Sequence, residues 1–184
     1  MRKLINFLTL SLAIVSFSFV NASAQGTSAL ANQIDLGKQV QKSILKLPQY
    51  EVFDNIDFTV EDGGVVTLTG KVRNAINKSD AEGSVKRIKG VTEVINNIEV
   101  LPLGSFDESI RRNLYASISR MGGLSRYLWE VNPDVRLIVD RGHVTLEGNV
   151  YREGDKNAMR IAALSVPSVF TVTNNLTVGS TDAR

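Results

Sequence analysis

The sequence of 184 residues contains no cysteine and a single histidine, His143. The absence of cysteine excludes disulfide bonds, a thiol nucleophile and a lipid-modified N-terminal cysteine. One imidazole without a second ligand is a poor basis for a metal site, so we predict neither a metal nor a cofactor. No serine lies in a nucleophile elbow, and the scattered acidic residues form no repeated pair. The sequence therefore predicts a protein that is not an enzyme.

The chain also lacks a net charge once its first residues are set aside. Arg2 and Lys3 precede an apolar run, Phe7 to Val20, and Ala22-Ser23-Ala24 follows as a small-residue cleavage site. This order predicts a signal peptide, residues 1–24, and a periplasmic protein cleaved after Ala24 that is able to associate with membranes. An uncleaved anchor is the alternative, although the apolar run is shorter than the roughly 20 residues of a spanning helix.

Without the two basic residues of the leader, 19 of the 21 basic residues remain and face 19 acidic residues. A chain with this balance has no global field that would draw it to nucleic acid, so any electrostatic binding must come from a local patch.

Residues 61–100 recur as residues 139–178, at a constant offset of 78. A repeat of this length is a folded unit in its own right. We therefore predict two domains, 34–101 and 105–178. The remaining segments, 25–33 and 179–184, have little periodicity and are predicted to be a flexible lead and a flexible tail.

Each copy shows the same order of patterns. In the first, apolar residues at helical spacing run from Leu36 to Leu47, and alternating residues on both sides of 62–64 indicate a hairpin. Ser79 and Glu82 have the spacing of a capping box, which predicts the start of a second helix that ends at Gly90. The final strand follows a helix after a hairpin, which favours parallel pairing through a right-handed crossover. The fold predicted is α+β: two copies of an αββαβ domain, each a three-stranded mixed sheet packed on two helices.

Four glycines recur at matching places and are interpreted as structural. Gly64 and Gly142 lie in the predicted hairpin turns. Gly70 and Gly148 lie inside strand patterns, where glycine indicates a bulge or close packing of a helix.

The second copy contains eight or nine extra residues before its hairpin, and its opening pattern, Ser105 to Glu108, is another capping box. A basic and aromatic stretch, residues 110–129, precedes the hairpin and includes the only tryptophan. An amphipathic helix with such residues lies flat in a lipid headgroup region, whereas the alternative is a solvated helix face with the tryptophan in the core. The candidate lipid-binding residues are Arg111, Arg112, Arg120, Arg126, Tyr127 and Trp129.

The duplicated pattern resembles the BON domain, a family named after bacterial osmotically inducible and nodulation proteins. The residues that carry the resemblance are Gly64, Val66-Thr67-Leu68, Gly70, Val72, Val91, Val94, Asn96 or Asn97, Ile98 and Val100, with their counterparts in the second copy. Pro167-Ser168 replaces Lys89-Gly90 there, so the end of the second helix departs from the pattern.

The resemblance implies a non-enzymatic envelope protein that binds phospholipid surfaces or envelope proteins. We therefore expect binding to an anionic phospholipid surface, in support of envelope integrity or tolerance of osmotic stress. The alternative is a periplasmic adaptor or chaperone-like module, because a three-stranded sheet leaves an edge that accepts an extended client segment. The sequence names neither the lipid, nor a protein partner, nor an oligomeric state.

Overall fold

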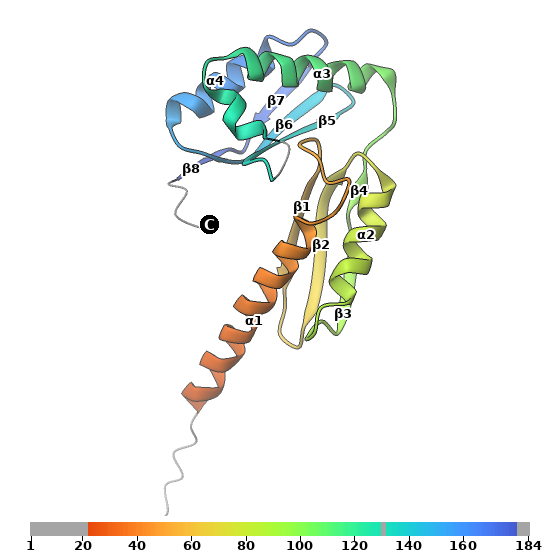
Figure 1. Cartoon of the computed structure of the whole chain (residues 1–184), viewed down its shortest axis with the longest axis vertical. Helices are drawn as coiled ribbons and strands as arrows, with labels where there is room; N and C mark the ends of the chain where they lie inside the picture. The colour runs from red at the N-terminus through yellow and green to blue at the C-terminus, as the bar shows by residue number, and fades with distance from the viewer. Residues whose placement is uncertain (1–21, 130–131, 180–184) are drawn as a thin grey trace, which may run out of the picture.

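The chain uses one order of elements twice, as the repeat predicted. The structure is a computed structural model that describes residues 22–129 and 132–179 (Figure 1). The elements of the first domain are α1 (Ala22–Ile44), β1 (Asn55–Val60), β2 (Val65–Val72), α2 (Ala75–Lys86), β3 (Glu93–Asn96) and β4 (Glu99–Val100). Those of the second are α3 (Ser105–Arg120), η1 (Leu124–Leu128), β5 (Val135–Asp140), β6 (His143–Val150), α4 (Glu153–Leu164), β7 (Thr171–Asn174) and β8 (Thr177–Val178).

The central strand of each sheet makes both kinds of pairing. In the first domain β2 pairs antiparallel with β1 through the hairpin and parallel with β3 and β4. In the second domain β6 pairs in the same way with β5, β7 and β8. Each domain buries its own apolar cluster between the sheet and its two helices. The predicted α+β fold of two mixed sheets is confirmed.

A repeated asparagine divides the last strand of each domain in two. The side-chain oxygen of Asn96 accepts a hydrogen bond from the Ile98 amide at 3.2 Å, and its side-chain amide donates to the Lys78 carbonyl at 3.0 Å. Asn174 makes the same two bonds, to Leu176 and Lys156. These bonds interrupt the strand and tie it to the preceding helix.

Gly70 and Gly148 are required for a reason other than close helix packing. Their φ angles are +113° and +114°, a region that residues with a Cβ rarely adopt. A Cβ on Gly70 would lie 2.2 Å from the Asn55 carbonyl oxygen, and one on Gly148 would lie 2.1 Å from that of Asp134. Both glycines therefore let the two strands of a hairpin approach each other closely. Gly64 and Gly142 lie in the hairpin turns, also with positive φ.

The predicted helix starts are wrong in their details. Helix α2 begins at Ala75, four residues before the expected capping box, because the Asn74 side chain accepts the Ile76 amide and caps the helix there. Helix α3 does begin at Ser105, but no side-chain cap bond forms. Asp107, inside the expected box, instead accepts the amides of the β5–β6 turn, at Arg141 and Gly142.

The expected flexible lead, residues 25–33, is helical, because α1 begins at Ala22. The alanines at positions 22, 24, 29 and 31 favour a helix, whereas Gly26, Thr27 and Ser28 oppose it, so neither propensity nor apolar periodicity predicted this extension of α1. Figure 1 shows this part of α1 projecting beyond the first sheet. Residues 1–21 of the predicted leader and residues 180–184 of the predicted tail lie outside the described residues.

Substitution Gly70→Ala is expected to destabilise the first domain by about 2–4 kcal/mol, because the new methyl group meets a carbonyl and φ is positive. Urea unfolding followed by circular dichroism measures the loss. The matched control is Gly83→Ala in α2, where the added Cβ has only an ordinary contact at 3.6 Å and helix propensity improves stability by up to about 1 kcal/mol. Equal effects of the two substitutions would contradict this explanation of Gly70.

Candidate functional site

The basic and aromatic stretch 110–129 is not one amphipathic helix. Helix α3 ends at Arg120, a turn with Gly123 at φ +81° follows, and residues 124–128 form a short 3-10 helix. The prediction of a single helix is therefore wrong beyond Arg120. The six candidate lipid-binding residues therefore lie in α3, in the short 3-10 helix and directly after it.

Arg111 lies inside the protein, with a side chain that is 1% exposed. One guanidinium nitrogen donates to the Val139 carbonyl oxygen at 2.8 Å, and the other is 3.5 Å from the Glu108 carboxylate. Val139 is in β5, so Arg111 fastens α3 to the edge of the second sheet. Its burial removes it from any surface that a lipid could reach.

Arg126 and Tyr127 hold the 3-10 helix against the start of α4. The Tyr127 side chain is fully buried, donates to the Asp155 carboxylate at 2.6 Å and accepts the Tyr151 amide at 3.0 Å. Burial raises the pKa of Tyr127, and the hydrogen bond to Asp155 adds to this increase. Arg126 forms an ion pair with the same carboxylate at 2.7 Å. Both residues therefore have structural partners, and Tyr127 offers no exposed ring.

Arg112, Arg120 and Trp129 remain at the surface. The two arginines lie on the exposed side of α3, and neither has a hydrogen-bond or ion-pair partner among the residues that the structure describes. Trp129 is 67% exposed. These three residues can meet a ligand outside the protein without unfolding any part of it.

Trp129 and its counterpart in the first copy, Tyr50, have different surroundings. The sequence Tyr50-Glu51-Val52 of the first copy recurs as Trp129-Glu130-Val131, and residues 130–131 lie outside the described residues. The ring of Tyr50 lies 4.2 Å below the guanidinium of Arg136, in the contact between the domains. The aromatic ring that the first copy uses for this contact is thus exposed in the second.

A second exposed aromatic group was missed by the sequence analysis. Phe106, at the start of α3, is 46% exposed, and Phe170, before β7, is 65% exposed. Their ring centroids are 5.9 Å apart, and His143 lies at the same distance from Phe170. The repeat offset of 78 aligns Phe170 with Thr92. The alignment of a polar residue in one copy with an aromatic residue in the other could have indicated this site from the sequence.

The two domains are held together by residues 45–54, which we call the joint segment. Val52 of this segment belongs to the apolar core of the second domain, and Phe53 packs against it. The Val52 carbonyl accepts the Leu137 amide of β5 at 2.8 Å. Arg136, also in β5, donates to the Glu51 carbonyl at 3.0 Å. The joint segment therefore lies along the edge of the second sheet and completes its core.

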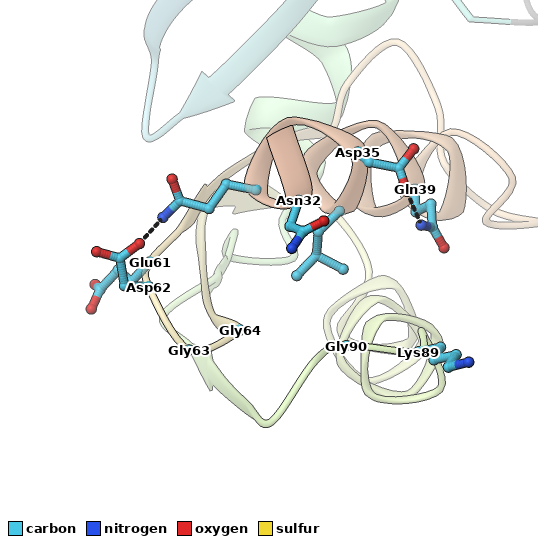
Figure 2. A pocket seen from close by; sticks show the side chains of 11 residues that line it. Asn32, Asp35, Gln39, Glu61, Asp62, Gly63, Gly64, Lys89 and Gly90 are labelled. Atoms are coloured by element: carbon cyan, nitrogen blue, oxygen red, sulfur yellow. Dashed lines mark hydrogen bonds between the residues drawn. The ribbon is translucent and has the colours of Figure 1, made fainter. Parts of the chain in front are cut away.

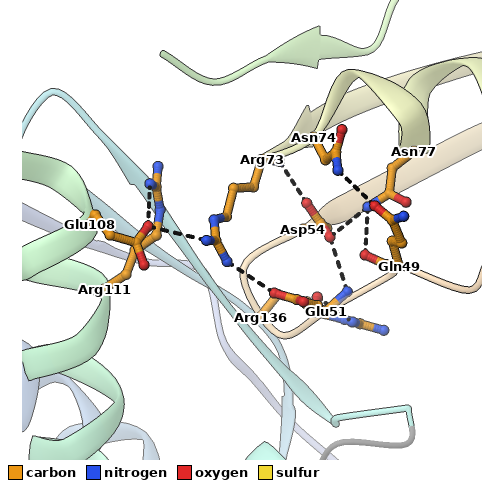
Figure 3. A network of polar contacts seen from close by, with 9 residues as sticks. All are labelled: Gln49, Glu51, Asp54, Arg73, Asn74, Asn77, Glu108, Arg111 and Arg136. Atoms are coloured by element: carbon orange, nitrogen blue, oxygen red, sulfur yellow. Dashed lines mark hydrogen bonds and ion pairs between the residues drawn. The ribbon is translucent and has the colours of Figure 1, made fainter. Parts of the chain in front are cut away.

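A polar network fixes the joint segment from the other side (Figure 3). The buried carboxylate of Asp54 accepts the amides of Arg73 at 2.6 Å and Glu51 at 3.0 Å, and the side-chain amide of Asn77 at 2.9 Å. Burial raises the pKa of Asp54. The Arg73 guanidinium links Glu51 at 3.1 Å with Glu108 of the second domain at 3.4 Å.

Lys71 and Asp140 form a further ion pair between the domains, at 2.7 Å. The hydrogen bond from Lys71 lowers the pKa of Asp140. Because the pKa is lowered in the folded protein, this contribution to stability is complete above the usual range of an aspartate and is lost as the pH falls through the lowered value.

A hollow of 590 Å³ lies at the far end of the first domain (Figure 2). Asp35, Asp62 and Glu61 line it together with Lys89. Two of these carboxylates accept hydrogen bonds from side-chain amides: Asp35 from Gln39 and Asp62 from Gln33.

Within residues 22–129 and 132–179 no group of three or more potential ligands could hold a metal ion. In the same ranges, no helix has the length and apolar content needed to cross a membrane.

Substitution Val52→Ala is expected to loosen the second domain although the residue belongs to the first. It removes apolar volume from the second core at a cost of about 1–2 kcal/mol and weakens the bond from the Leu137 amide. Hydrogen exchange should show faster exchange at Leu137. The control Val91→Ala, at a partly buried residue packed against the first core, should leave that amide unchanged. Unaltered exchange at Leu137 in Val52→Ala would show that the joint segment does not support the second domain.

Comparison with known proteins identifies the repeated unit. The BON-domain profile matches residues 29–102 and 106–180. Comparison with curated proteins gives no match. Among solved structures, the chain is similar to the C-terminal domain of CdsD, the structural protein of the type III secretion system of Chlamydia trachomatis. The identity is 16% and the TM-score 0.32, over 80% of this chain and 99% of that one.

A second structure of CdsD matches at 15% identity and a TM-score of 0.30, over 79% of this chain and 94% of that one. Likenesses this weak carry no argument about this chain. BON domains are non-catalytic in general and occur in membrane-associated or envelope proteins, typically periplasmic ones. Because the profile matches most of both repeats, the chain belongs to the BON-domain family and carries that domain twice.

Proposed function

We propose that this protein binds anionic phospholipid surfaces through its second domain and so supports the bacterial envelope under osmotic stress. The observation that carries the proposal is the divergence of the two copies. The second domain exposes the aromatic rings of Trp129 and Phe170. Their counterparts in the first domain are Tyr50, whose ring contacts Arg136, and the polar residue Thr92. Tryptophan and other aromatic rings favour the headgroup region of a bilayer.

The type of basic residue also differs between the two domains, and this difference too favours lipid binding by the second. Residues 34–101 contain seven lysines and two arginines, whereas residues 105–178 contain one lysine and eight arginines. A guanidinium can hold a phosphate through two parallel hydrogen bonds, which an ammonium cannot do. The unpartnered side chains of Arg112 and Arg120 therefore fit lipid phosphates better than the lysines of the first domain do.

The expected affinity is modest. A basic residue near an anionic surface contributes about 1 kcal/mol, so Arg112 and Arg120 together contribute about 2 kcal/mol. Binding of useful strength then requires that an aromatic side chain also enters the interface. Helix α3, with 16 residues, is about 24 Å long, and it separates Phe106 at its start from Arg120 at its end. A helix lying flat on the membrane would let both ends contact lipid.

Export to the periplasm is part of the same proposal. The basic start, the apolar run and the cleavage site Ala22-Ser23-Ala24 support it. Mass spectrometry of the protein isolated from the envelope fraction would test it, with Gln25 as the expected first residue. A chain that retains Met1 would contradict cleavage and favour an anchor.

The double substitution Arg112→Gln/Arg120→Gln is expected to weaken binding to anionic vesicles roughly 30-fold, the equivalent of about 2 kcal/mol. Cosedimentation with phosphatidylglycerol vesicles, compared with phosphatidylcholine vesicles, gives the measurement. Raising the salt should weaken binding of the unaltered protein, because the Debye length falls. The matched control is Lys38→Gln/Lys42→Gln, which removes the same charge from the exposed side of α1. If the control loses as much affinity, net charge and not this surface controls binding.

The substitution Phe170→Thr places the residue of the first copy at the exposed position of the second. It should weaken binding to the same vesicles about tenfold with no loss of folding stability, because the ring is largely outside the core. Ile95→Thr, which removes an exposed apolar side chain of the first domain, serves as the control and should leave binding unchanged. Full binding by Phe170→Thr would exclude the Phe106–Phe170 pair from the lipid-binding surface.

A further inference from the structure

Each sheet ends in an edge strand whose outward backbone groups can be identified from the register. In the first hairpin the Glu61 amide donates to the Val65 carbonyl at 2.9 Å, so residues 55, 57, 59 and 61 bond to β2. The backbone groups of Ile56, Phe58 and Val60 therefore point away from β2. In the second hairpin the same alternation leaves Val135, Leu137 and Val139 of β5 pointing outward.

The edge of β5 is occupied by the protein itself. The Leu137 amide donates to the carbonyl of Val52 in the joint segment, and the Val139 carbonyl accepts a guanidinium hydrogen bond from Arg111. The turn at Val52–Phe53 and one buried cation thus occupy outward groups of β5 that an added strand would need.

The corresponding edge of β1 is open. The Ile56 amide donates to the Tyr50 hydroxyl at 3.0 Å. On the outward side of Phe58 and Val60, no backbone partner is present within residues 22–129 and 132–179. Gln41 takes the place of Arg111 in the first copy when Ile44 is aligned with Leu114, and its side chain is exposed. Unpaired edge groups of this kind are a template for another strand.

A groove of 340 Å³ runs beside this edge and is built from both domains. Its apolar side is formed by Ile44, Leu45 and Phe58, and its polar side includes the exposed carboxylate of Asp57, which accepts one hydrogen bond, from the Asn55 side chain at 2.8 Å. The cation that lines it, Arg136, is already engaged with the Tyr50 ring and the Glu51 carbonyl. The groove therefore suits an apolar side chain next to a basic one.

We propose that the β1 edge and this groove bind an extended segment of another protein, with alternating apolar and basic residues, as an added strand. The outward amide and carbonyl groups of Phe58 supply backbone hydrogen bonds, and the groove receives the side chains on one face of the segment. The carboxylate of Asp57 attracts the basic residues. The proposal concerns the β1 edge and the groove between the domains, and it is independent of lipid binding by α3 and the exposed aromatic residues of the second domain.

A short synthetic peptide that alternates valine and lysine is the first probe. Fluorescence anisotropy with the full chain should detect its binding, and an otherwise identical peptide with glutamate in place of lysine should bind at least tenfold more weakly. A third peptide, methylated on its backbone nitrogens along one edge, should not bind, because it lacks the donors for the β1 carbonyls. Equal binding of the three peptides would overturn the proposal.

Substitution Asp57→Lys should reduce binding of the valine–lysine peptide at least tenfold. Asp80→Lys, with the same change of charge on the exposed surface of α2, should leave it unchanged. Hydrogen exchange should slow at the Phe58 and Val60 amides when the peptide is present and stay the same at Leu137. Protection elsewhere than β1, or equal losses in the two variants, would refute the site. Trp129→Ala, which alters only the proposed lipid surface, should bind the peptide normally.

Discussion

Insertion of Val52 into the core of the second domain is the contact on which the arrangement of the protein depends. It places a segment of the first domain along the edge of β5, where the Leu137 amide and the Arg136 side chain hold it. The ion pairs of Arg73 and Lys71 then connect the domains on either side of that segment. Exposed ion pairs contribute little on their own, so the buried valine and the backbone bond carry the association.

The two copies retain one fold and have diverged in what they expose. The first copy uses its aromatic residue, Tyr50, to make the joint, and among the described residues nothing pairs with the outward backbone groups of Phe58 and Val60 in β1. The second copy closes its sheet edge with Arg111 and exposes the rings of Trp129 and Phe170. A tandem of identical scaffolds can thus present two different surfaces, one suited to an extended chain and one to a lipid headgroup region.

The sequence predicted the hairpins and the order of elements well, whereas it misplaced the start of two helices, α1 and α2. Alternation of apolar residues around a turn glycine such as Gly64 specified each hairpin, and the order of elements required parallel pairing of the last strand. Contacts between distant residues were not predictable in this way. Arg111 looked like a surface cation, but its partner, the Val139 carbonyl, is 28 residues away and becomes its neighbour only when the sheet forms.

The same limitation explains the remaining errors in the candidate site. The pair of Phe106 and Phe170 is brought together by folding, and no local pattern joins the two residues. Tyr127 resembled an interfacial aromatic, but its side chain is buried and its hydroxyl donates to the Asp155 carboxylate of α4. Trp129, by contrast, was placed either at a lipid surface or in the core, and its exposure excludes the core position.

Trp129 also offers the most direct test of lipid binding, because it is the only tryptophan in the chain. Its fluorescence can be measured in anionic vesicles whose lipids carry bromine at defined depths of the acyl chain. Bromine near the headgroups should quench the emission strongly and bromine near the bilayer centre weakly, since an interfacial ring stays at headgroup level. Vesicle-bound protein whose emission is quenched at neither depth would contradict the account, because the membrane would then be contacted by some other surface.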